Sequence, residues 1–315
     1  DVYKRQNYWN CAWRSLTKKK GFSVVNIVGL AIGMAAALLI LTYVAFEYSY
    51  DDMHSRQDRI FRVEARFYEN GELTDDWASS SAGYATAMKQ NMSAVEDYTR
   101  VGSQYYPEQV VKYNELLYRE TGIGYAEANF FDFFDFKLLK GNKESCLDGP
   151  NKVVITERIA RKYFKGADPI GKILIFRSNI GEEACEVTGI MEDMPINTHI
   201  RYNLLISYKT LPKWMDEYWY RHEVYSYVLL KSANLKTQVE EDFPVMAEKY
   251  KTEEALKNKT WAIQLTNLRD IHLNPQKAYE PEVKGNRSSI WVLICTALAI
   301  LCIAWINYIL SLIHI

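Results

Sequence analysis

The chain of 315 residues carries a formal net charge of −1, so it lacks the strong positive charge that marks nucleic-acid-binding domains. Hydrophobic residues make up 48% of it and charged residues 24%, a composition that folds and that argues against disorder. Composition therefore excludes a nucleic-acid partner and a disordered chain, and it leaves a globular or membrane protein.

The two ends of the chain do not resemble the rest of it. Residues 1–6 read DVYKRQ and residues 310–315 read LSLIHI, and both resemble translated sequencing-adaptor sequence. We expect them to be non-native tails, which fold reasoning sets aside like a fusion scar. The native protein is then expected to continue beyond Ile309, so that this chain is an N-terminal fragment.

Residues 7–21 combine apolar residues at helical spacing with a run of cations. We expect a short amphipathic helix on the cytoplasmic membrane surface, with indole rings at headgroup level and lysines near anionic lipid. The anchoring residues would be Trp9, Trp13, Lys18, Lys19 and Lys20. The alternative is a frayed juxtamembrane segment, because the stretch is short.

Residues 22–46 contain no charged side chain and predict a transmembrane helix. Such a helix would be about 37 Å long, enough to cross a hydrocarbon core of roughly 30 Å. Lysines precede this segment whereas Glu47 and Asp51 follow it, so we expect the N-terminus in the cytoplasm. A cleaved signal peptide, the alternative, would have a shorter apolar core and small residues beyond it.

Three small residues of this span lie four apart and therefore share one helix face: Gly29, Gly33 and Ala37. Small residues let helices approach closely within lipid, so we expect this face to pack against another helix. Ordinary span composition is the alternative, because glycine is frequent in membrane helices.

A second uncharged run, Ile290–Ile309, predicts another transmembrane helix over residues 288–309. Residues 47–287 then form a large extracytoplasmic domain. Because both strand and helix patterns occur within it, we predict an α+β fold: a mixed α/β domain inserted between two transmembrane α-helices.

The elements of this domain follow from periodicity and turn signals. Residues 47–58 are expected to continue the first helix outward, and alternating side chains over 59–67 predict a strand with one buried face. Helices are predicted over 82–92, from the N-cap candidate Thr156 to Gly166, and over 235–250. Further strands are predicted over 98–105, 109–113, 153–155, 172–177, 185–190, 204–207, 225–231 and 261–268.

Five phenylalanines lie between residues 130 and 136. They could form a ligand platform, but an aromatic turn that packs the core is the favoured interpretation, because such rings usually bury.

No pattern of residues indicates catalytic, cofactor or metal chemistry. The sequence has neither a nucleophile elbow nor a phosphate-binding loop, so we expect the chain to be no enzyme and to bind no ATP. Asp51, Asp52 and His54 resemble a metal site only weakly, because no further ligand can be identified. Whether Cys146 and Cys185 form a disulfide stays open, because the sequence does not give their separation.

Several stretches together resemble one family. They are NIVGLAIGMAAALLIL (26–41), EYSYDDMHSRQDRIFRV (47–63), NFFDFFDFKLLKG (129–141), VVITERIARKYFKGADPIGK (153–172), VTGIMEDMPINTHI (187–200) and CIAWINYI (302–309). In their order and spacing they resemble the MacB/FtsX-type permeases of ABC transporters, in the style of the Bacteroidetes.

This resemblance implies a multi-pass protein of the bacterial inner membrane with a periplasmic domain between its first two spans. It implies a permease dimer, paired with a cytoplasmic ABC ATPase subunit, that transmits ATP hydrolysis as mechanical movement to the periplasmic domain. A periplasmic adaptor is a further partner to consider. Substrates of such efflux and release systems include antibiotics, peptides and lipoproteins, and some relatives activate cell-wall hydrolases.

Two other functions fit the hydropathy. A two-span sensor with an extracytoplasmic ligand-binding domain fits equally well, and the sequence that follows the second span would distinguish it from a permease. A membrane-anchored extracytoplasmic enzyme is disfavoured, because no catalytic constellation can be identified.

Overall fold

The computed structural model describes residues 20–102, 108–178, 181–214, 218–219, 221–251, 258–281 and 284–313. The chain divides into two compact units, one of residues Asp1–Ser49 with Gly285–Ile315 and one of Tyr50–Lys284. Most of the expected juxtamembrane helix, with Trp9, Trp13, Lys18 and Lys19, lies outside the described residues.

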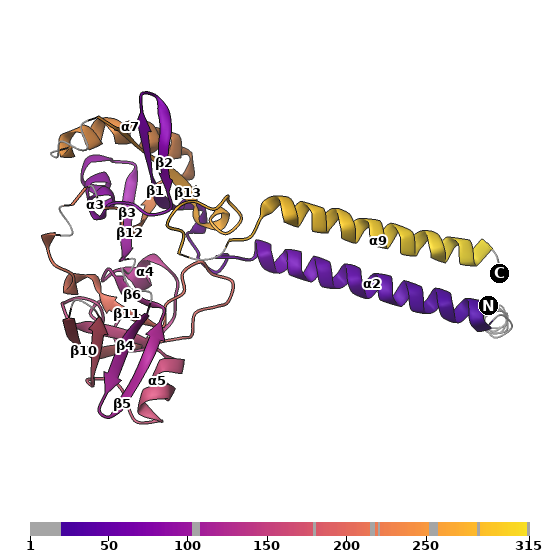
Figure 1. The fold of residues 1–315 in the computed structure, drawn as a ribbon, viewed down its shortest axis with the longest axis horizontal. Helices are drawn as coiled ribbons and strands as arrows, with labels where there is room; N and C mark the ends of the chain where they lie inside the picture. The colour runs from indigo at the N-terminus through magenta and orange to yellow at the C-terminus, as the bar shows by residue number, and fades with distance from the viewer. Residues whose placement is uncertain are drawn as a thin grey trace. The chain divides into compact units, whose positions relative to one another are not determined.

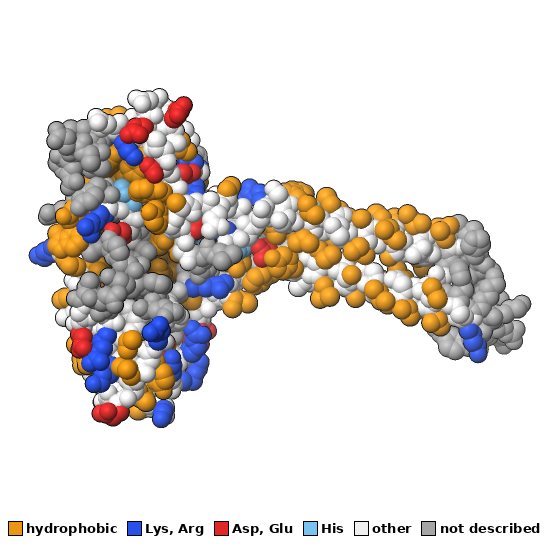
Figure 2. Space-filling model, viewed as in Figure 1, with side chains coloured by type: hydrophobic (Ala, Val, Ile, Leu, Met, Phe, Trp, Pro, Cys, Tyr) orange, Lys and Arg blue, Asp and Glu red, His pale blue; other side chains and the backbone are white. Residues whose placement is uncertain are grey.

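The first unit is a pair of long helices, α2 (Lys20–Tyr48) and α9 (Arg287–Ile313). They run side by side in opposite directions (Figure 1). Val24–Tyr48 and Arg287–Leu310 are long and apolar enough to cross a membrane. Hydrophobic side chains line the face of both helices that Figure 2 shows, and Leu39 is 73% exposed. Apolar surface of this extent suits lipid better than water.

The two helices meet along a row of small side chains. Ala37, Ala297 and Ala304 are buried between them. A Cβ atom added to Gly33 would lie 3.2 Å from the Cβ atom of Ala304, so the helices approach closely at this point.

The second unit contains all the described strands. They are β1 (Ile60–Glu69), β2 (Glu72–Trp77), β3 (Val95–Gly102), β4 (Glu108–Tyr113), β5 (Leu116–Thr121), β6 (Ile123–Ala126), β7 (Leu138–Lys140), β8 (Lys152–Thr156), β9 (Ile173–Ser178), β10 (Gly181–Met191), β11 (Leu204–Ser207), β12 (Val224–Leu230) and β13 (Thr260–Asn267). Its α-helices are α3 (Ala82–Asn91), α4 (Phe130–Phe133), α5 (Glu157–Phe164) and α7 (Lys236–Ala247). Short 3-10 turns are η1 (Gln57–Arg59), η2 (Tyr208–Thr210), η3 (Ala233–Leu235), η4 (Glu248–Tyr250) and η5 (Leu268–Asp270).

These strands join into one sheet in the order β13-β1-β12-β3-β6-β11-β8-β10-β9-β4-β5, with β2 beside β1 and β7 beside β10. The pairs β6–β11 and β8–β10 are parallel, whereas the other ladders are antiparallel. The predicted mixed α/β domain between two apolar helices is therefore confirmed.

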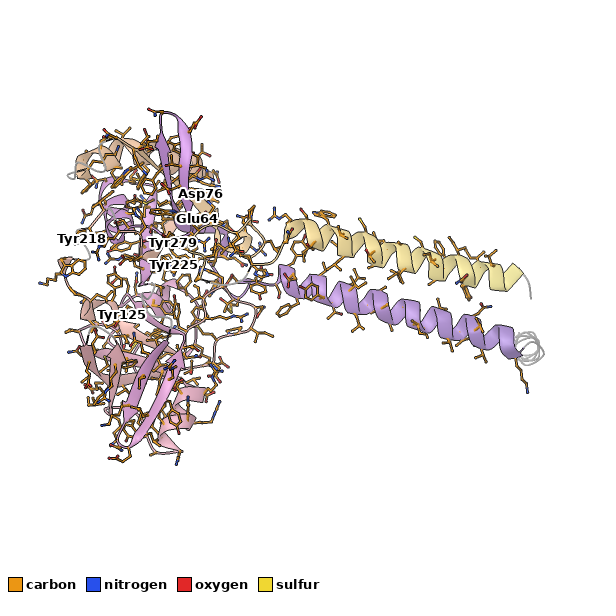
Figure 3. The ribbon with its side chains drawn as sticks, viewed as in Figure 1. Glu64, Asp76, Tyr125, Tyr218, Tyr225 and Tyr279 are labelled. Atoms are coloured by element: carbon orange, nitrogen blue, oxygen red, sulfur yellow. The ribbon has the colours of Figure 1, made fainter. Side chains whose placement is uncertain are left out.

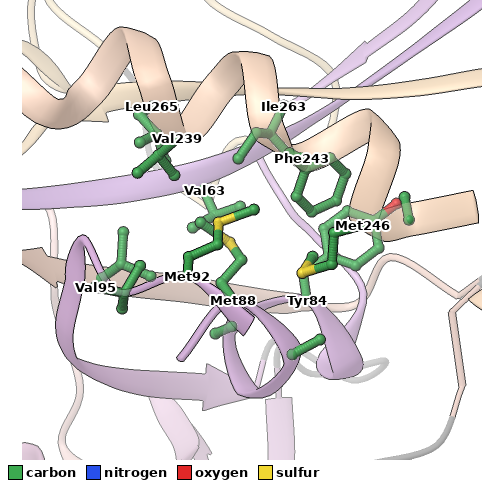
Figure 4. Close-up of a cluster of buried hydrophobic side chains, with 14 of the residues drawn as sticks. Val63, Tyr84, Met88, Met92, Val95, Val239, Phe243, Met246, Ile263 and Leu265 are labelled. Atoms are coloured by element: carbon green, nitrogen blue, oxygen red, sulfur yellow. The ribbon is translucent and has the colours of Figure 1, made fainter. Parts of the chain in front are cut away.

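Hydrophobic clusters cover the sheet. One packs α3 and α7 onto β1, β12 and β13 through side chains such as Tyr84, Met88 and Phe243 (Figure 4). Another contains the five phenylalanines of residues 130–136, all of them buried. This confirms the prediction that these rings belong to the core. A third cluster seats α5 on β8 to β10.

Helix α5 begins and ends close to where the capping residues of the sequence predict. Thr156 caps the helix by accepting a hydrogen bond from the backbone N–H of Ile159 at 3.4 Å. The helix ends where Lys165 and Gly166 adopt φ values of 50° and 98°, and glycine takes such values without strain.

Two predictions at the start of the domain are wrong. The first helix does not extend to residue 58, because α2 ends at Tyr48 and Asp51 turns the chain with a φ of 60°. Strand β1 is not half-buried, because Arg62 and Glu64 on its polar side are as buried as its apolar residues. Each of these polar side chains is held by a partner distant in sequence.

Candidate functional site

The first residues of the domain are held by a buried cluster, which we call the N-terminal cluster: Asp51, His54, Thr198, His199 and Tyr227. The Oδ2 atom of Asp51 lies 2.7 Å from His199 Nδ1, and the hydroxyl of Thr198 donates to Asp51 Oδ1 at 2.6 Å. The backbone N–H of Asp51 donates to the carbonyl of Asn197 at 3.0 Å. The chain is thereby fixed to a distant loop as soon as it enters the domain.

The N-terminal cluster extends into the sheet. The Nε2 atom of His199 lies 2.8 Å from the hydroxyl of Tyr227 on β12. Burial would raise the pKa of Asp51, but His199 and Thr198 outweigh it and hold that pKa below its ordinary value. Asp51 is therefore a buried carboxylate whose charge is compensated, and losing a partner would be costly.

His54 lies beside this carboxylate in a pocket of aromatic rings. Its ring centre is 5.4 Å from that of Phe134 and 5.1 Å from that of Phe136. Its Nδ1 accepts a hydrogen bond from the backbone N–H of Asp135 at 3.3 Å. Burial lowers the pKa of His54 to about 4, although Asp51 partly opposes this shift. At neutral pH the side chain is therefore uncharged.

The last residues of the domain are held by a second buried cluster, the C-terminal cluster: Arg62, Glu64, Lys277, Glu280 and Lys284. The Nη2 atom of Arg62 lies 2.6 Å from Glu64 Oε1 and 2.8 Å from Glu280 Oε1. Lys277 Nζ lies 2.9 Å from Glu64 Oε2, and Lys284 pairs with Glu280. Figure 3 shows Glu64 close to Asp76, which also binds Lys277.

The charged groups of the C-terminal cluster pair with one another, and Lys277 also with Asp76, almost out of contact with water. The side chains of Arg62 and Glu64 are 0% and 1% exposed. Burial would lower the pKa of Arg62, but Glu64 and Glu280 more than offset this effect and hold the pKa above its ordinary value. Removing one partner from such a network typically costs about 3–5 kcal/mol, because an uncompensated charge stays buried.

Backbone contacts add to this attachment. Ala278 forms a parallel bridge with Trp77 at the end of β2, and the backbone N–H of Ala78 donates to the carbonyl of Ala278 at 2.9 Å. The hydroxyl of Tyr225 donates to the carbonyl of Tyr279 at 2.7 Å, and Figure 3 shows these two tyrosines together. The segment that leaves the domain is therefore bound to the sheet at several points.

The contacts of the two clusters attach the ends of the domain to its sheet. The described residues contain no group of three His, Cys, Asp or Glu side chains placed to hold a metal ion. Cys146 and Cys185 are both free thiols, so no disulfide joins them, and burial raises their pKa values to about 11 and about 12.

The three predicted helix-packing residues differ in their burial and in their neighbours. Ala37 is buried and Gly33 faces Ala304, whereas a Cβ atom on the exposed Gly29 would meet nothing within 4 Å. Of the predicted anchoring residues only Lys20 is described, and it is exposed. The role of these residues stays a prediction.

The sequence had not pointed to His199 or to the C-terminal cluster. Charged residues within an alternating strand are ordinarily assigned to its solvent face. The remaining signal was the presence of two opposite charges, Arg62 and Glu64, on the same face of a single strand.

The sequence of residues 23–244 matches the family model of the MacB-like periplasmic core domain. No curated protein matches the chain significantly.

Several solved structures resemble the chain, among them the following three. A domain of a protein described as a permease, from Porphyromonas gingivalis, has a TM-score of 0.60 and 23% identity, and the match covers 73% of this chain and 95% of that one. The periplasmic region of MacB from Actinobacillus actinomycetemcomitans has a TM-score of 0.41, 14% identity and coverages of 63% and 87%. The extracellular domain of the noncanonic ABC-type transporter YknZ from Gram-positive bacteria has a TM-score of 0.42, 13% identity and coverages of 65% and 100%. The first shows a shared fold, whereas the likeness of the other two is too weak to support an argument.

Two apolar helices that flank a domain of periplasmic type fit a protein of the inner membrane. The family model covers well over half of the chain. The protein therefore belongs to the family of ABC transporter permeases that carry a MacB-like periplasmic core domain.

Proposed function

We propose that this chain is a permease subunit that carries movement from a separate cytoplasmic ATPase to its periplasmic domain. The observation that supports this most directly is the attachment of both ends of the domain. The N-terminal cluster binds the segment that begins at Tyr50, and the C-terminal cluster binds the segment that ends at Lys284.

Such attachment matters because force passes poorly through flexible linkers. A chain that enters a domain through a mobile loop can move without displacing the domain. Here Asp51 and Glu280 form buried charge-assisted bonds near the two boundaries of the domain, and these are strong and costly to leave unpaired. A displacement of either connecting segment is therefore expected to move the whole sheet.

The remaining parts of the proposal rest on family membership and on charge. The ATPase, a second permease copy and a periplasmic adaptor are the proposed partners, and antibiotics, peptides or lipoproteins are the proposed substrate classes for export or release. The N-terminus is placed in the cytoplasm because cations, Lys20 among them, precede the first span. Family membership favours this function over a two-span sensor.

The division of labour between the chain and its ATPase can be tested directly. The purified chain, reconstituted alone in lipid nanodiscs, should bind and hydrolyse no ATP, because its sequence has no phosphate-binding loop. The complete native permease, reconstituted with its proposed partner ATPase, should hydrolyse ATP. Robust turnover by the chain alone, at a preparation purity that excludes a contaminating ATPase, would contradict the proposal.

A further inference from the structure

The loop between β10 and β11 carries an exposed apolar tip. Ile196 is 69% exposed, and Met194 and Pro195 precede it. A single exposed isoleucine is common on protein surfaces and indicates nothing by itself. The position of this one is unusual, because polar bonds hold the tip against the first residues of the domain.

Four contacts fix the loop at that place. The carbonyl of Asn197 accepts from the backbone N–H of Asp51 at 3.0 Å. The side chain of Arg201 donates to the carbonyl of Thr198 at 3.2 Å, to the hydroxyl of Tyr50 at 3.4 Å and to the carbonyl of Ile196. Arg201 therefore binds the tip and the start of the domain at the same time.

Chain length limits how far this tip can be from lipid. Tyr50 is the second residue after α2, which ends at Tyr48 as a candidate membrane span. Two residues of extended chain cover at most about 7 Å. A side chain bound to Tyr50 and Ile196 together is thus within reach of the headgroup layer that surrounds the end of the span.

Beside the tip lies a hollow that suits an anionic headgroup. Its volume is about 510 Å³, and Arg158, Arg201, Tyr202, Met194 and Ile196 are among the residues that line it. Asp193 also lines it, but its carboxylate accepts from the backbone N–H of Arg158 at 3.0 Å and pairs with Arg161 at 3.3 Å. The hollow therefore combines guanidinium groups with an apolar wall.

We propose that this loop is a membrane-contact site of the periplasmic domain. Ile196 enters the boundary between headgroups and acyl chains, while Arg158 and Arg201 meet the phosphate group of an anionic phospholipid. The test of this contact needs neither ATP nor the ATPase, so its outcome is separate from that of the proposed function.

The first experiment asks what surrounds residue 196. The complete permease, freed of its native cysteines, carries Ile196→Cys with an environment-sensitive fluorophore and is reconstituted in vesicles of phosphatidylcholine with phosphatidylglycerol. Ile170→Cys is the matched control, because it also replaces an isoleucine in a turn, and the side chain of Ile170 is 38% exposed. We expect a blue-shifted emission and quenching by headgroup-attached nitroxide at residue 196 only.

The alternatives give different results. Quenching by aqueous iodide without quenching by nitroxide would show that the tip lies in water, which overturns the proposal. Protection from both quenchers would show that another protein covers the tip, which also overturns it.

The second experiment tests the role of charge. Nitroxide quenching at residue 196 is measured as phosphatidylglycerol replaces phosphatidylcholine. Arg158→Gln, a change at an exposed position, should weaken the lipid dependence about fivefold, because one arginine near an anionic surface contributes about that factor. Lys143→Gln, which removes an exposed cation outside the loop, is the control and should leave it unchanged. Equal effects of the two substitutions would contradict a specific role for the hollow.

Discussion

At the scale of single residues, burial keeps the side chain of His54 uncharged to a pH well below its ordinary pKa. It is 1% exposed, with Asp51, His199 and Asp135 as its charged or titratable neighbours. Its pKa is lowered to about 4 from 6.5, so the unfolded chain binds a proton between these pH values that the folded domain does not bind. Stability contributed by neutral His54 is therefore complete above the higher value and is lost as the pH falls toward the lower one.

We predict that acidification from pH 7 to pH 4 removes roughly 3 kcal/mol of stability through this residue. The measurement is urea unfolding of the chain in detergent micelles, followed by tryptophan fluorescence. His54→Gln supplies the comparison, because its side chain does not titrate. The loss through Asp51, whose pKa is lowered from 3.8, falls at still lower pH and stays separate. A pH dependence that is identical in both proteins would show that His54 does not titrate as described.

Single residues also show what sequence reasoning misses. The alternation over 59–67 would leave Arg62 and Glu64 on the solvent face, because such a pattern treats every charge as exposed. Their burial depends on Lys277 and Glu280, which follow more than 200 residues later in the chain. The phenylalanines of residues 130–136 were placed correctly, because burying an aromatic ring needs no specific partner.

At the scale of elements, the two apolar helices pack through small residues. The contact of 3.2 Å that a Cβ atom at Gly33 would make with Ala304 leaves no room for a larger side chain. Overpacking of this kind usually costs about 1–3 kcal/mol. A larger side chain at residue 33 should therefore disturb the packing of α2 against α9, whereas a larger side chain on the face of α2 directed away from α9 should not.

We predict that Gly33→Leu inserts normally in the complete native permease with its ATPase but loses most ATP-driven function. Leucine keeps the segment apolar while it pushes the two helices apart. The measurement pairs membrane insertion with ATP-driven transport or release.

Two controls belong to this prediction. Gly29→Leu makes the same change where an added Cβ atom meets nothing within 4 Å, and Ile32→Leu conserves volume at a side chain that is 64% exposed. Both should keep function more fully than Gly33→Leu. Unchanged function in Gly33→Leu would mean that the small residues are ordinary span composition.

Elements with strong local signals were predicted well, and connections between distant elements were not. Helix α5 has a capping threonine and a glycine at its end, and strand β11 occupies its predicted residues, 204–207. The helical continuation over 47–58 failed because Asp51 bonds to the distant loop that carries Thr198 and His199. The order of strands within the sheet likewise depends on pairings that no local pattern contains.

At the scale of the whole molecule, topology is the first property to test. We predict that residues 47–287 lie outside the cytoplasm, because cations precede the first span. Cysteines at Lys143 and Lys209, both exposed, should react with an impermeant maleimide in intact spheroplasts that express a variant without native cysteines. Labelling that occurs only after lysis would place the domain in the cytoplasm.

The central claim is that the domain moves with the ATPase cycle because both of its ends are attached to the sheet. Spin labels at Lys209→Cys in the two copies of the complete permease, reconstituted with its ATPase, report the distance between the domains by pulsed electron spin resonance. A Glu280→Gln variant, in which the C-terminal cluster loses a carboxylate, shows whether the attachment is needed.

The account predicts that the distance distribution shifts between the nucleotide-free and the vanadate-trapped complex. It also predicts that Glu280→Gln broadens or abolishes this shift while ATP hydrolysis continues. An unchanged distribution in the native complex, under conditions in which its ATPase turns over, would contradict the account.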